Sequence, residues 1–85
     1  MYGDTQAIRG LARTMRGEAT ALRCEAEALL ARAESVQWSG LAADAMRARV
    51  GQQVDSLRRT AALADDAAEA LDLSLIHISE PTRPY

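Results

Sequence analysis

The chain has 85 residues, a net charge of −2 at pH 7, and only three aromatic residues: one Trp, two Tyr and no Phe. This length allows one small domain, and the slightly acidic balance argues against a nucleic-acid partner, because such proteins usually carry a basic surface. Hydrophobic residues make up 48% of the chain, but most are Ala. Such a chain can bring helices close together, and we expect it to need a partner to bury them.

The first predicted helix covers residues 5–36, with Asp4 or Thr5 as its N-cap. Two rows recur every seven residues and lie on one helix face. The bulky row is Ile8, Met15, Leu22, Leu29 and Val36, and the small row is Ala12, Ala19, Ala26 and Ala33. The small row lets a neighbouring helix approach closely, and the seven-residue repeat is typical of left-handed, coiled-coil-like packing. Arg16 and Arg23 fall outside these rows, on the side we expect to be solvated.

The predicted turn, residues 37–40, contains the only Trp of the chain, in the sequence Trp38-Ser39-Gly40. We expect Ser39 to cap the second helix and Trp38 to pack on Ala43, in the manner of a hydrophobic staple. Gly40 relaxes the backbone at the bend.

The second predicted helix covers residues 41–72 and repeats the same pattern. Its rows are Val50, Leu57, Ala64 and Leu71, and Val54, Ala61 and Ala68. A short turn between two equal amphipathic helices, each about 48 Å long, predicts an all-α antiparallel hairpin. The larger side chains predicted to pack within the hairpin or a dimer are Ile8, Met15, Leu22, Leu29, Val36, Val50, Val54, Leu57 and Leu71.

The composition changes at Leu73, because every Ala lies in residues 1–72 while both Pro and the only His lie in residues 73–85. The segment LSLIHISEPTRPY resembles a translated sequencing-library adapter. We therefore expect residues 73–85 to be a non-native or disordered tail, with the natural C-terminus missing.

No constellation of residues indicates catalysis, a metal or a cofactor. His77 has no companion, and Cys24 has no base to activate it. We interpret the acidic residues Asp65, Asp66 and Glu69 as a solvated patch. Ser39 has neither a base nor an oxyanion loop beside it. We expect a protein that is not an enzyme.

Residues 1–72 resemble the WXG-motif family, early-secreted-antigen-like substrates of type VII secretion in actinobacteria and firmicutes. The resemblance rests on the hairpin pattern, on Trp38-Ser39-Gly40 at mid-chain, and on the following LAADAM. It implies a homodimer or heterodimer of hairpins packed as a four-helix bundle, with Trp38 and Gly40 as motif residues. It also implies export of the folded dimer without a cleavable signal peptide, and recognition by a secretion ATPase.

One element of the family pattern is missing. The usual Tyr-x-x-x-Asp/Glu export element after the second helix has no match here, because Tyr85 is terminal and Tyr2 is followed four residues later by Gln6. Either a truncation removed the element or a partner supplies it. Two further interpretations stay open: the targeting domain of a longer secreted toxin, and a coiled-coil adaptor or oligomerisation hairpin unrelated to secretion. No segment is apolar enough for a transmembrane helix.

Overall fold

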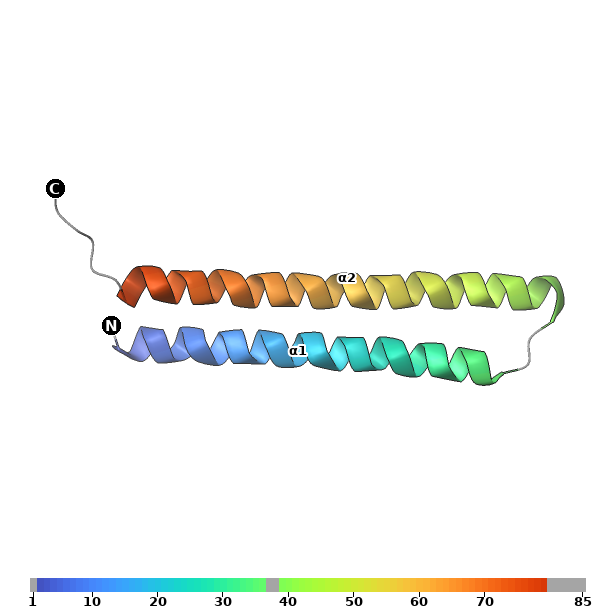
Figure 1. The fold of residues 1–85 in the computed structure, drawn as a ribbon, viewed down its shortest axis with the longest axis horizontal. Coiled ribbons are helices and arrows are strands. Elements are labelled where there is room, and N and C mark those ends of the chain that lie inside the picture. Colours follow the sequence, from blue (N-terminus) through green and yellow to red (C-terminus); the bar gives the residue numbers. More distant parts are fainter. Residues whose placement is uncertain (1, 37–38, 80–85) are drawn as a thin grey trace.

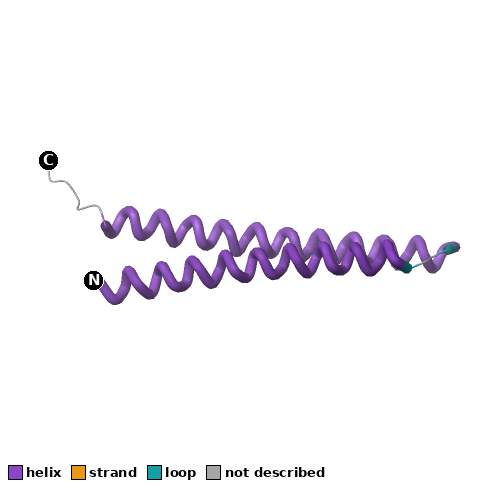
Figure 2. Tube along the Cα trace, turned by 60° about the horizontal axis from the view of Figure 1, so that its bottom comes forward, coloured by secondary structure: helices purple, strands orange, loops and turns teal. Residues whose placement is uncertain are grey.

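Two long helices form an antiparallel hairpin in the computed structural model, which describes residues 2–36 and 39–79. Helix α1 is Tyr2–Ser35 and helix α2 is Gly40–Ser79. Figure 1 shows the two helices side by side in opposite directions, with α2 beginning beyond the end of α1. The second view shows the same pair, with no further layer on either helix (Figure 2). The predicted all-α hairpin is confirmed.

The contact between the helices is lined by methyl-sized side chains that recur every seven residues. In α1 the buried residues are Ala12, Ala19 and Ala26, and in α2 they include Val54, Ala61 and Ala68, each no more than 2% exposed. Short side chains let the two backbones approach closely, as the spacing predicts. Among the described residues no large side chain is fully buried, so this contact is thin.

Helix α1 begins three residues before its predicted start, which makes the N-cap prediction wrong. Asp4 lies in the first turn of the helix and not at its cap. A carboxylate in the first turn still stabilises the helix, because it faces the positive end of the helix dipole.

Helix α2 continues seven residues past the predicted end at residue 72, so residues 73–79 are helical and not disordered, while their non-native origin stays a prediction. The reason lies in the heptad: Leu75 follows Ala68 by seven residues and is only 8% exposed. The small row of α2 therefore extends into this segment and keeps it against α1. Residues 80–85 lie outside the described part of the chain.

We expect Leu75→Ala to lower the free energy of unfolding by about 2 kcal/mol, because it removes a buried side chain from the helix contact. Leu73→Ala is the matched control, since Leu73 is 59% exposed and its change should stay within about 0.5 kcal/mol. Urea titrations followed by circular dichroism measure both. Equal effects of the two substitutions would contradict the packing of residues 73–79 on α1.

Candidate functional site

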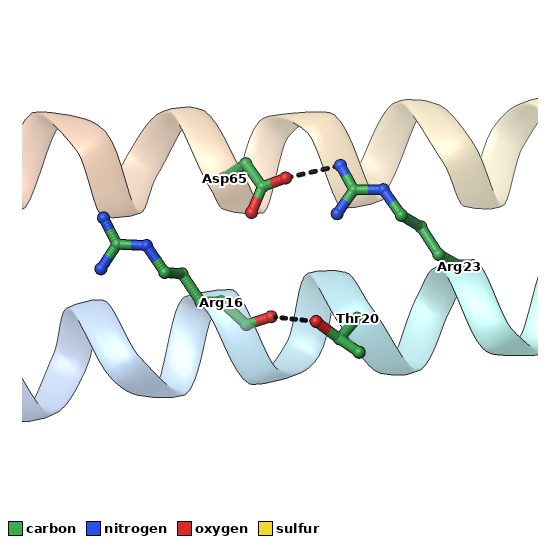
Figure 3. Close-up of polar contacts among 4 residues, drawn as sticks. All are labelled: Arg16, Thr20, Arg23 and Asp65. Atoms are coloured by element: carbon green, nitrogen blue, oxygen red, sulfur yellow. Dashed lines mark hydrogen bonds and ion pairs between the residues drawn. The ribbon is translucent and has the colours of Figure 1, made fainter.

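One side of the hairpin carries two ion pairs between the helices. Arg16 pairs with Asp72, and Arg23 Nη2 lies 2.5 Å from Asp65 Oδ2 (Figure 3). From the first pair to the second, the chain advances seven residues along α1 and steps back seven along α2. The geometry is therefore repeated after two turns, as an antiparallel register requires. All four side chains are 41–49% exposed, so each pair contributes at most about 1 kcal/mol.

These pairs correct the view of Arg16 and Arg23 as merely solvated, because both reach across to α2. The backbone beneath them is regular: the Thr20 hydroxyl donates to the Arg16 carbonyl oxygen at 3.1 Å (Figure 3), a common way for a Thr inside a helix to satisfy its hydroxyl. We call this side of the hairpin the ion-pair side.

The opposite side of the hairpin carries the bulky rows. Met15 is three residues after Ala12 and Arg16 is four, so these two side chains flank the buried row on opposite sides. In α2, Ala64 and Asp65 have the same relation to the buried row. Because the arginines and aspartates share one side, the bulky rows share the other. We call it the apolar face; it consists of Ile8, Met15, Leu22, Leu29, Val50, Leu57, Ala64 and Leu71, all half-buried.

The nine larger side chains predicted to pack thus fall into three groups. Val54 lies in the contact between the helices, at 2% exposed. Val36 follows the end of α1 and is 47% exposed. The remaining seven belong to the apolar face, where α1 and α2 bring them together without burying them.

The exposed area of the chain is large for its mass. The accessible surface is 6672 Å², whereas a compact monomer of 9.2 kDa exposes about 4,900 Å². The excess of about 1,700 Å² follows from the elongated shape of a two-helix hairpin, which leaves most of each helix in solvent. The apolar face is the part of this surface best suited to a helical partner.

At the turn, Gly40 has a φ of +79°, a left-handed conformation that strongly favours glycine. Because its φ is not helical, Gly40 occupies the cap position of α2, where glycine is accepted. The predicted Ser39 cap is not found: among the described residues, the exposed Ser39 side chain makes no hydrogen bond to the first turn of α2. Trp38, and with it the predicted contact to Ala43, lies outside the described residues.

The described residues offer little for chemistry. A pocket of about 180 Å³ lies between the last turns of α1 and the start of α2, at Leu30 and Val50, and it is smaller than typical ligand sites. Within residues 2–36 and 39–79, no three acidic, His or Cys side chains are grouped as metal ligands. Cys24 is exposed. Neither α1 nor α2 has a stretch apolar and long enough to cross a membrane.

Taken together, fold and surface define an antiparallel helical hairpin with one apolar face that the rest of the described chain leaves uncovered. Comparisons with protein-family models, with curated proteins and with solved structures found no match.

Proposed function

We propose that the chain is a small WXG-type substrate of type VII secretion, or the dimerising partner of such a substrate, and that it acts through protein–protein contacts. The observation that carries the proposal is the position of Trp38-Ser39-Gly40 between two long antiparallel helices, α1 ending at Ser35 and α2 beginning at Gly40. Export would proceed without a cleavable signal peptide.

In this proposal the apolar face is the dimer surface, and two hairpins pack face to face as a four-helix bundle. The half-buried bulky rows support it, because they repeat every seven residues on both helices, as knobs-into-holes packing requires. Either a homodimer or a heterodimer would cover the face.

The proposal extends to a secretion ATPase as a further partner, contacting the turn of the hairpin. Leu41, in the first turn of α2, is 89% exposed. A large apolar side chain held so far into solvent suits a contact surface better than a packing role.

Export from an actinobacterium with a type VII system tests the function. We expect the epitope-tagged full chain to reach the medium when it is produced with a hairpin partner that carries the Tyr-x-x-x-Asp/Glu element. Alone, or in a matched strain without the secretion ATPase, it should stay in the cells. Trp38→Ala should keep most of the helicity seen by circular dichroism but lose export.

Release that does not depend on the ATPase would contradict the proposal. Dimerisation without any export would instead favour an oligomerisation hairpin unrelated to secretion. The nucleotide sequence past codon 72 would show whether the hairpin leads a longer secreted toxin.

A further inference from the structure

We propose that the partner on the apolar face is not a second copy of this chain but a helical hairpin with two basic side chains, seven residues apart, that lie against Glu18 and Glu25. This inference rests on the proposed use of the apolar face in dimerisation. It adds the chemistry by which the partner is selected.

A row of mostly acidic residues borders the apolar face along α1, on the side away from α2. Each member follows a bulky residue of the face by three positions, except Asp4, which precedes Ile8 by four. We call this row the acidic edge; it consists of Asp4, Leu11, Glu18, Glu25 and Arg32, all exposed. It carries three carboxylates and one guanidinium.

Glu18 and Glu25 have no cation within reach on their own helix. The positions three and four residues away hold only Ala, Leu, Met and Thr. The ion pairs of the described residues involve other carboxylates: Asp44, Asp65 and Asp72. Asp65 and Asp72 are thus paired across the helices, whereas Glu18 and Glu25, like Glu27 and Glu34, make no ion pair among the described residues.

A helix that packs on the apolar face must lie along this edge. In a four-helix bundle each helix has two neighbours about a quarter turn apart, so the partner of α1 in the other hairpin lies against the acidic edge. That contact places Glu18 and Glu25 at its solvent-exposed rim, as Arg16 and Arg23 lie at the rim of the contact between α1 and α2. At such a rim a cation opposite each carboxylate is favourable and a like charge is unfavourable, so a partner with matching cations is favoured over one without.

A second copy packed with its turn at the opposite end does not provide those cations. In this arrangement α1 lies antiparallel to its own copy. Every register that overlaps more than half of α1 then sets one carboxylate of the acidic edge against another. Arg32 of one copy meets an acid of the other copy in only two kinds of register. One kind also sets Glu18 or Glu25 against the same residue of the other copy, and the other kind loses most of the overlap between the two helices.

A second copy packed with its turn at the same end also provides no cations opposite the acidic edge. There the acidic edge lies along the outer row of α2, which borders the apolar face from the other side. That row is Met46, Gln53, Thr60, Ala67 and Ser74. It holds no cation in any register, so neither Glu18 nor Glu25 would gain a charged partner.

The charge-reversed copy E18R/E25R of the full chain is the probe, because it keeps the apolar face and places basic side chains on its edge. We expect wild-type chain and probe, mixed one to one, to form a heterodimer at least tenfold tighter than the self-association of either chain. Sedimentation equilibrium measures all three constants. The advantage should shrink severalfold in ~1 M salt, where charge interactions are screened.

The matched control is E27R/E34R, which reverses two exposed glutamates, also seven residues apart on α1 but towards the ion-pair side. We expect no gain from mixing wild type with this copy. Circular dichroism first checks that both variants are as helical as the wild type.

A tight wild-type homodimer, an equal gain with the control, or no association with the probe would each overturn the inference. None of these results affects the export test. Loss of export with a partner that does bind the acidic edge would instead overturn the proposed function and leave the inference intact.

Discussion

Replacing Ala61 by Leu is expected to lower the free energy of unfolding by about 3 kcal/mol. Ala61 is fully buried in the contact between α1 and α2. Three additional carbon atoms have no space there unless the two backbones move apart, and such a movement would separate the neighbouring alanines as well. Thermal and urea unfolding, followed by circular dichroism at 222 nm, measure the change.

Ala62→Leu is the matched control, one residue along the same helix. Ala62 is exposed, and Leu is nearly as good a helix former as Ala, so the expected change is within about 0.5 kcal/mol. If Ala61→Leu were as stable as the wild type, the helices would not be in close contact at this level, and the methyl-lined packing described above would be incorrect.

Replacing Leu57 by Asp is expected to weaken the heterodimer with the E18R/E25R copy at least a hundredfold, about 2.7 kcal/mol. Leu57 is half-buried on the apolar face. The partner would cover it, and a carboxylate buried there without a cation is strongly unfavourable. The hairpin itself should remain folded, because the side chain already has access to solvent.

Leu63→Asp makes the same change at a position that is 67% exposed and does not belong to the apolar face. We expect its effect on association to be less than twofold. Sedimentation equilibrium of each variant with the charge-reversed copy gives both values. Similar losses for the two variants would show that association uses another surface of the hairpin.

Much of the hairpin follows from periodicity that a reader of the sequence can count. The seven-residue spacing of Ala12, Ala19 and Ala26 predicts a face that packs closely against a neighbour, and these alanines are indeed buried. The helix ends were harder to predict. Ala68 and Leu75 belong to one row, but the change of composition at Leu73 concealed this continuity.

The turn shows a different kind of difficulty. A Ser before a helix is a common cap, so the sequence favours Ser39, yet the positive φ of Gly40 moves the cap by one residue. Backbone conformation at a single glycine depends on how the chain must turn to bring α2 alongside α1. Such a requirement comes from the packed hairpin and is not encoded in local propensity.

The candidate site required the tertiary structure for the same reason. Periodicity places a bulky row and a small row on each helix, but it does not say which row faces the other helix and which is left for a partner. That choice depends on the rotation and register of α1 against α2. The pairing of Arg16 with Asp72, which are 56 residues apart, depends on both the rotation and the register of the two helices.

The two helices, the place of the turn between them and the heptad depend on residues three, four and seven positions apart, so the sequence alone is sufficient to predict them, although not the exact helix ends or the cap. The separation of an ion-pair side from an apolar face, and the acidic edge beside that face, exist only when two distant segments are packed together. The physical reason is that a surface belongs to the assembled pair of helices and to neither helix by itself.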